Sequence, residues 1–195
     1  MELKDGKPTF QAPDRAAWRA WLQDHCAKEK GVWLIIYKKK SQQASVYYDE
    51  AVDEALCFGW IDSKPNKRDE ESFYQYFSKR SPKSNWSRVN KEKIARLEAA
   101  GLIAEAGYEM IRIAKANGTW TALDDVENLV IPPDLQQAFD AQPIAWEHFS
   151  QFPRSTKRSI LEWIFNAKRA PTREKRIKET VDLAAQNIRA NQYRK

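Results

Sequence analysis

Cysteine and histidine are scarce in this chain of 195 residues, which holds two of each. Cys26 and Cys57 are too few for a disulfide framework, and their spacing is not that of a metal-binding motif. His25 and His148 stand at no motif spacing from a serine, cysteine or glutamate, so no local pattern supports a nucleophile with its base. Phosphate-binding glycine loops and the HExxH motif are also missing. We therefore predict no catalytic residue, no resident metal and no cofactor, and favour a binding protein over an enzyme.

Long apolar runs are lacking as well. No stretch approaches the roughly 20 apolar residues of a membrane span. The first ten residues, MELKDGKPTF, are charged and lack the apolar centre of a secretory signal. Apolar residues nevertheless make up 42% of the chain and eight residues are tryptophan, enough for a substantial core. The composition predicts a cytoplasmic protein with reduced thiols and no membrane span.

Positive charge gathers in two regions. Residues 154–178 hold nine Lys/Arg against two acidic residues, and residues 63–93 hold nine against four. Such regions are either solvated faces or places that attract an anionic partner. They support one alternative function, a nucleic-acid-binding protein that uses both regions and binds more weakly as salt rises.

The pattern of apolar residues predicts strands only in the first part of the chain. We expect a helix over Pro13–Gly31, a strand over Val32–Lys40 and a helix over Tyr48–Phe58. Two short strands are expected within Trp60–Arg80, joined by a polar turn around Lys64–Glu71. The aromatic side chains of the second of these strands are expected to pack against the first helices.

The rest of the chain is predicted to be helical. One helix is expected to begin at Ser87 or Asn90 and to end at Gly101, and the next is expected to end at Gly118. From Pro132 onward we expect only helices, broken at prolines, with Ile177, Val181, Ala184 and Ile188 on one buried stripe of the last. The fold class is therefore α+β, with a small mixed or antiparallel sheet. We divide the chain into an α+β core, residues 1–125, and a helical C-terminal subdomain, residues 126–195, packed on it as one compact unit.

The helix at Tyr48–Phe58 places three carboxylates and a thiol on one face: Glu50, Asp53, Glu54 and Cys57. If the face is exposed, this is an ordinary amphipathic helix. If it is covered, the carboxylates need partners, for which Tyr37, Lys39 and Arg80 are candidates. Neighbouring carboxylates raise the pKa of a thiol, which speaks against a nucleophilic Cys57.

Two candidate binding sites follow from the polar and aromatic residues near the GWIDS turn. The first is a ligand pocket between sheet and helices, lined by Tyr37, Glu50, Glu54, Trp60, Asp62, Tyr76, Arg80 and Trp86. The second is an anion site at a helix N-terminus, made by Lys83, Ser84, Ser87 and Arg88. The expected partner is an unknown small molecule or anion, with a protein partner as another option.

Several segments of the chain resemble one bacterial family. They are EAVDEALCFGWIDS (Glu50–Ser63), SPKSNWSRVNKEKI (Ser81–Ile94), WIFNAKRAPTREKRIKETV (Trp163–Val181), GVWLIIYKK (Gly31–Lys39) and IPPDLQQAF (Ile131–Phe139). In this order they look like the YdeI/OmpD-associated, or bacteriocin-protection-like, family, and they span nearly the whole chain.

The resemblance implies a binding or stress-protection role, because the family carries a label of bacteriocin protection and porin association. It supplies no reaction and no catalytic residues. The N-terminal part is also similar to a small α+β domain of proteins proposed as iron chaperones, which makes a metal-ion chaperone a second alternative by fold analogy.

Overall fold

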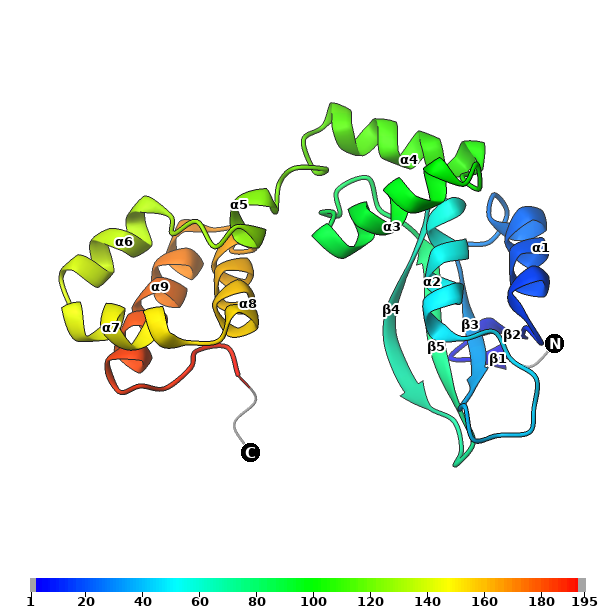
Figure 1. Cartoon of the computed structure of the whole chain (residues 1–195), viewed down its shortest axis with the longest axis horizontal. Coiled ribbons are helices and arrows are strands. Elements are labelled where there is room, and N and C mark those ends of the chain that lie inside the picture. The colour runs from blue at the N-terminus through cyan, green and yellow to red at the C-terminus, as the bar shows by residue number, and fades with distance from the viewer. Residues whose placement is uncertain (1–2, 193–195) are drawn as a thin grey trace. The chain divides into compact units, whose positions relative to one another are not determined.

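The computed structural model describes residues 3–192, which divide between Thr121 and Ala122 into two compact units. Each is described by itself (Figure 1). The first unit contains five strands and four helices, in the order β1 (Leu3–Lys4), β2 (Lys7–Gln11), α1 (Arg15–His25), β3 (Gly31–Tyr37), α2 (Tyr48–Cys57), β4 (Trp60–Lys67), β5 (Ser72–Lys79), α3 (Arg88–Ala99) and α4 (Glu105–Ala116). The predicted strands and helices of this part are confirmed, but β4 continues through Lys67 into the segment Lys64–Glu71 that was expected to be a turn. Strands β1 and β2 were not expected.

The sheet is mixed, with strand order β1-β2-β3-β5-β4. Strands β2 and β3 run parallel, and the other neighbours are antiparallel. Phe77 on β5 lies opposite Val32 on β3, and both belong to the core that the helices cover. Figure 1 shows α1 and α2 lying along the strands. The sheet therefore has one face under helices.

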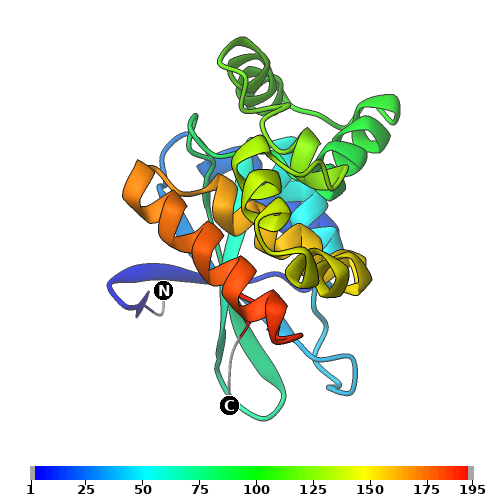
Figure 2. The same ribbon diagram turned by 90° about the vertical axis from the view of Figure 1, so that its left-hand side faces the viewer.

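The other face carries the alternate residues of the same strands. Tyr76 lies opposite Trp33, and Tyr74 lies opposite Ile35, one position out of phase with the core residues. In Figure 2 the dark-blue hairpin of β1 and β2 lies on the side of the sheet away from the cyan helix α2. The expectation that the aromatic side chains of this strand pack on the first helices is therefore right for Phe77 and wrong for Tyr74 and Tyr76.

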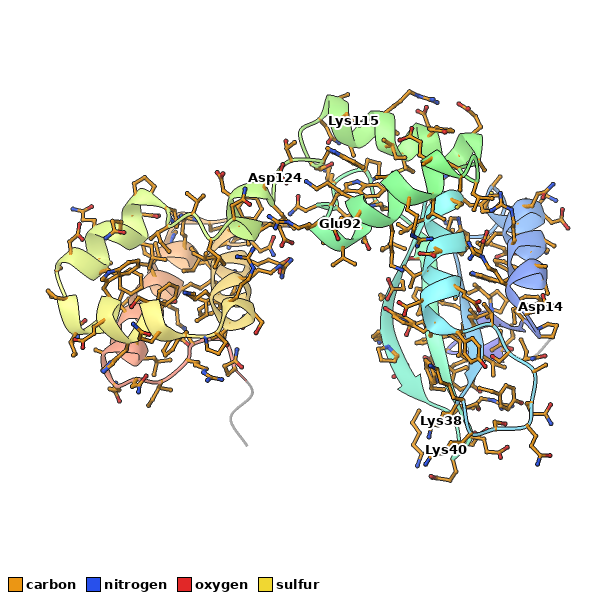
Figure 3. The ribbon with its side chains drawn as sticks, viewed as in Figure 1. Asp14, Lys38, Lys40, Glu92, Lys115 and Asp124 are labelled. Carbon is orange, nitrogen blue, oxygen red and sulfur yellow. The ribbon has the colours of Figure 1, made fainter. Side chains whose placement is uncertain are left out.

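The core of the first unit is rich in tryptophan. Trp18 of α1 stacks on Trp21 with ring centroids 5.2 Å apart, and its indole N–H donates to the carbonyl oxygen of Ala51 on α2. Asp14, labelled in Figure 3, caps α1 by accepting a hydrogen bond of 2.8 Å from the Ala17 amide. Gly59 ends α2 with φ +71°, a conformation that favours glycine. The hydrogen bond from Trp18 to Ala51 thus joins α1 to α2 within this core.

The second unit is entirely helical within its described residues. Its elements are α5 (Asp124–Glu127), α6 (Pro133–Asp140), α7 (Pro143–Gln151), α8 (Arg154–Phe165) and α9 (Ala170–Ala185). Ile160, Leu161 and Ile164 of α8 are buried in a core of this unit's own. The predicted stripe is confirmed at Ile177, Val181 and Ala184, which are also buried there.

Ile188 does not belong to that stripe. It lies beyond the end of α9 and is 39% exposed. The α+β fold class and the all-helical C-terminal part are confirmed, and the packing of one part on the other stays a prediction. None of the helices among residues 3–192 is long and apolar enough to cross a membrane.

Candidate functional site: a cavity beside Arg80

Two carboxylates of α2, those of Asp53 and Glu54, are buried and held by cations. Glu54 is 2% exposed and accepts hydrogen bonds from Arg15 at 2.5 Å and from Arg19 at 2.6 Å, both on α1. Asp53 is 5% exposed and accepts from Lys93 and Arg96, both on α3, at 2.8 and 2.6 Å. The face is therefore covered by helices. The prediction that Tyr37, Lys39 and Arg80 are the partners is wrong, because α1 and α3 supply all four cations.

Cys57 lies beneath this network and is fully buried. Burial, together with the charge of Glu54, raises the pKa of its thiol to about 11. A thiol with this pKa is protonated near neutral pH and is a poor nucleophile. Asp53 and Glu54 on this face of α2 thus form an internal ion-pair network that joins α1, α2 and α3.

The eight residues of the predicted ligand pocket have different surroundings. Tyr37 and Glu50 line a cavity of about 320 Å³ at the end of β3, together with Tyr47 and Tyr48. Asp62 accepts a 2.7 Å hydrogen bond from the Tyr48 hydroxyl. Burial raises the pKa of the Tyr48 phenol, and this hydrogen bond raises it further.

The remaining pocket residues lie elsewhere in the unit. Tyr76 is on the other face of the sheet, and Glu54 is in the ion pairs with α1. Trp60 is fully buried and contacts Trp21, while Trp86 is 1% exposed and contacts Trp120. Of the eight residues, Arg80 alone lines a second cavity, where the end of β5 meets α4. Their common role in ligand binding stays a prediction.

The residues of the predicted anion site make local contacts. Ser87 caps α3 by accepting a hydrogen bond from the Asn90 amide at 3.3 Å. The hydroxyl of Ser84 donates to the carbonyl of Ser81, and the amide of Lys83 donates to the Ser81 hydroxyl. Lys83 is exposed and Arg88 is half-buried. These contacts shape the turn before α3, and anion binding there stays a prediction.

A cavity of about 360 Å³ opens where the end of β5 meets helix α4. Its apolar lining consists of Ala27, Phe58, Pro82, Ala106, Met110 and Ile113. Its polar lining consists of the Cys26 thiol, the cations Lys79 and Arg80, and Glu109. The cavity combines an apolar wall with two cations, Lys79 and Arg80, and with the carboxylate of Glu109, which is paired with Arg112.

Arg80 is the unusual member of this lining. It is 3% exposed, and its guanidinium carbon lies 3.8 Å from the centroid of the Trp86 ring. One terminal nitrogen donates to the carbonyl of Asn85, but Nε and Nη1 are buried without a hydrogen-bond partner. Burial lowers the pKa of Arg80 to about 10, against the opposing charge of Asp62. Two strong donors therefore lack an acceptor beside a cavity.

The basic residues of the second unit are largely engaged inside it. Arg158 pairs with Glu127 and Glu162, and Arg173 pairs with Asp134. Further cations donate to main-chain carbonyls of the same unit: Arg154, Lys157 and Arg176. Much of this charge acts in holding helices together. Within residues 3–192 no group of three or more His, Cys, Asp or Glu is placed to hold a metal ion.

Two family models match the chain. A domain of unknown function, DUF8412, matches residues 10–110, which is half of the chain. A second model, described as Bacteriocin-protection, YdeI or OmpD-Associated, matches residues 128–187. The chain therefore belongs to the DUF8412 family, and its C-terminal part is similar to the YdeI/OmpD-associated family over residues 128–187. Searches of curated proteins and of solved structures gave no match.

The two matches refine the resemblance seen in the sequence. The YdeI/OmpD-associated match is confirmed and contains the segments Ile131–Phe139 and Trp163–Val181. It is narrower than expected, because Glu50–Ser63 and Ser81–Ile94 lie in the DUF8412 match. The cavity beside Arg80 is lined mainly by residues of the DUF8412 region, with Ile113 just beyond it.

Proposed function

We propose that the protein binds a small organic anion in the cavity beside Arg80. The observation that carries this proposal is the buried guanidinium whose Nε and Nη1 lack an acceptor. A buried donor without a partner costs about 1–3 kcal/mol, and an oxyanion supplies the missing acceptor with a charge-assisted hydrogen bond. Lys79 adds a second positive charge at the same place. A bound anion would also raise the pKa of Arg80, against the lowering that burial causes.

The shape and lining of the cavity restrict the class of ligand. A volume of about 360 Å³ suits a molecule the size of an aromatic or medium-chain acid. Phe58, Met110 and Ile113 would contact its apolar body, while Arg80 and Lys79 would hold its carboxylate or phosphate. An acid with an apolar body should therefore bind more tightly than acetate or inorganic phosphate.

The description of the C-terminal family suggests the biological setting. It names bacteriocin protection, so ligand binding would serve a protective or stress-related role in the cytoplasm. This description applies to residues 128–187 only, whereas the cavity lies in the first unit. The binding activity can therefore be tested without reference to that role.

Thermal shift and calorimetry with benzoate, octanoate, acetate and inorganic phosphate test the proposal. At a ligand concentration of one hundred times Kd, binding stabilises the folded state by about 2.7 kcal/mol. We expect benzoate or octanoate to raise Tm and acetate to have little effect. The Nε–H nuclear magnetic resonance signal of Arg80 should move on addition of the bound acid.

Three variants separate a specific site from general charge. Arg80→Met should abolish the Tm increase, and Ala27→Phe should weaken it by filling the cavity mouth while leaving Arg80 in place. Lys40→Met is the matched control, because Lys40 is an exposed cation just beyond β3 (Figure 3). Equal shifts with all four anions, or an unchanged response in folded Arg80→Met and Ala27→Phe, would overturn the proposal.

A further inference from the structure

Three aromatic rings and three cations share the face of the sheet opposite α2. The rings are those of Trp33 on β3 and of Tyr74 and Tyr76 on β5. The cations are Lys4 on β1, Lys7 on β2 and Arg68 in the β4–β5 turn. We call these six residues the aromatic face. Its members come from five parts of the chain and meet only through the sheet.

The rings form a continuous layer over β3 and β5. The ring centroid of Trp33 lies 4.9 Å from that of Tyr76 and 6.1 Å from that of Tyr74. Gly31 makes this layer possible, because a β-carbon at this position would collide with the Tyr76 hydroxyl. The Tyr76 ring therefore lies across β3. Tyr74 and Tyr76 are half-buried and keep part of their surface toward solvent.

Each cation of the aromatic face lies against a ring. The Nζ of Lys4 is 5.3 Å from the Trp33 centroid and 4.9 Å from that of Tyr74. The Nζ of Lys7 is 4.2 Å from the Tyr76 centroid and donates to its hydroxyl at 2.8 Å. The guanidinium of Arg68 is 5.9 Å from the Tyr74 centroid. Contacts of this kind at a surface are weak, so the lysine ends can turn toward an anion.

Two further observations point to a ligand with oxygen acceptors. Trp33 is 2% exposed, and its indole N–H is buried without a hydrogen-bond partner. Among the residues of β2, β3 and β5 no carboxylate occurs, and the acids nearest the cations stand in turns. Asp5 pairs with Lys4 at 3.8 Å, and Asp69 pairs with Arg68 at 3.0 Å.

We propose that the aromatic face binds single-stranded nucleic acid. Unpaired bases stack on Tyr74 and Tyr76, and the phosphates between them contact Lys4, Lys7 and Arg68. Aromatic side chains on a sheet, flanked by cations, are the arrangement by which proteins bind single strands without reading sequence. A duplex hides the faces of its bases and offers this surface only its phosphates. This site is separate from the cavity beside Arg80, so either proposal can fail without the other.

Fluorescence anisotropy with labelled 16-nucleotide dT and rU strands and a 16-base-pair DNA duplex tests the proposal. The full chain should bind one or both single strands at least tenfold more tightly than the duplex at low salt. Three phosphate contacts predict a slope of about −2 for log K against log salt concentration on single strands. The dT and rU arms show whether the surface prefers DNA or RNA strands, which differ here in the 2′-hydroxyl and in the 5-methyl group of the base.

Variants assign the binding to the rings and to the cations. Tyr74→Leu with Tyr76→Leu should weaken single-strand binding about tenfold or more, whereas Tyr74→Phe with Tyr76→Phe should bind normally because the rings remain. Lys4→Gln and Lys7→Gln should each reduce the salt slope by about 0.7. Tyr47→Leu, at an exposed tyrosine outside the aromatic face, is the matched aromatic control and should bind as the unchanged chain does.

The possible results separate stacking from simple attraction of charge. Equal affinity for single strand, duplex and heparin would overturn the proposal, as would the absence of single-strand binding at low salt. Should circular dichroism show that the double leucine variant is unfolded, the phenylalanine and lysine variants decide. A loss of binding in the phenylalanine variant, or an unchanged salt slope in Lys4→Gln and Lys7→Gln, contradicts the assigned contacts.

Discussion

Gly107 of α4 packs directly on the backbone carbonyl of Cys57, the last residue of α2. A β-carbon at Gly107 would lie 2.9 Å from the carbonyl carbon and closer still to its oxygen. The same carbonyl accepts a 3.0 Å hydrogen bond from the Ala104 amide. The start of α4 is thus fixed to the end of α2 through backbone atoms, which cannot move aside as a flexible side chain can.

Gly107→Ala is therefore expected to destabilise the protein by about 3 kcal/mol, the upper range for forcing extra atoms into a packed interior. Gly101→Ala serves as a comparison, because Gly101 has φ +66° but open space around its α-carbon. It should cost about 1 kcal/mol through backbone strain alone. Urea unfolding followed by far-ultraviolet circular dichroism measures both. Equal losses in the two variants would show that the contact with Cys57 is not tight.

The stability should fall in acid because of Asp53. Burial opposes ionisation of this carboxylate, but hydrogen bonds from Lys93 and Arg96 outweigh it and lower the pKa of Asp53. A group whose pKa is lower in the folded state adds stability above its unfolded pKa of about 3.9, and this is lost as the pH falls through the folded pKa. Urea unfolding at pH 5 and at pH 2.5 should show the loss.

Asp53→Asn removes that pH dependence and exposes its cause. The variant should be less stable by about 3 kcal/mol at pH 7, because two cations lose a buried partner. It should also lose less stability than the unchanged chain between pH 5 and pH 2.5. Asp49→Asn, at a side chain that is 86% exposed, should change the stability at pH 7 by less than about 0.5 kcal/mol. An Asp53→Asn variant with the full acid sensitivity would exclude Asp53 as its source.

The two thiols should differ in reactivity. Cys57 is fully buried with a pKa of about 11, whereas Cys26 is half-buried and lines the cavity beside Arg80. Ellman's reagent at pH 8 should label one thiol of the folded protein and two in denaturant. Cys26→Ser should remove the reaction of the folded state. A bound acid in the cavity should slow it, whereas two thiols reacting at one rate would contradict the described burial.

The sequence pattern predicted which residues share one face of a helix, but not which elements cover that face. Periodicity alone placed Asp53, Glu54 and Cys57 on one side of α2, because spacing along a helix is a local property. It could not identify what covers that side, because the cations that bind Glu54 lie 39 and 35 positions away and those that bind Asp53 lie 40 and 43 positions away. The partners were therefore assigned to the wrong elements.

The first strands were missed for a related reason. Strand β2 is five residues long and contains Pro8, so its local signal is weak. It becomes a strand by pairing in parallel with β3, for example Phe10 beside Leu34, which is a contact between distant segments. The aromatic face depends on this pairing, since Lys4 and Lys7 reach the rings only through β1 and β2. Tyr76 lies on the side of β1 and β2 because it alternates along β5 with Phe77, which faces the helices.

Each unit closes its own apolar core, one within residues 12–114 and the other within residues 123–190. The family matches leave the short stretch 111–127 between them, and the border of the two units, Thr121 to Ala122, falls inside it. The border between the two compact units therefore coincides with the border between the two family matches. A protease that cuts at this border, between Ala114, the last buried residue of the first core, and Leu123, the first of the second, would remove no buried side chain from either core.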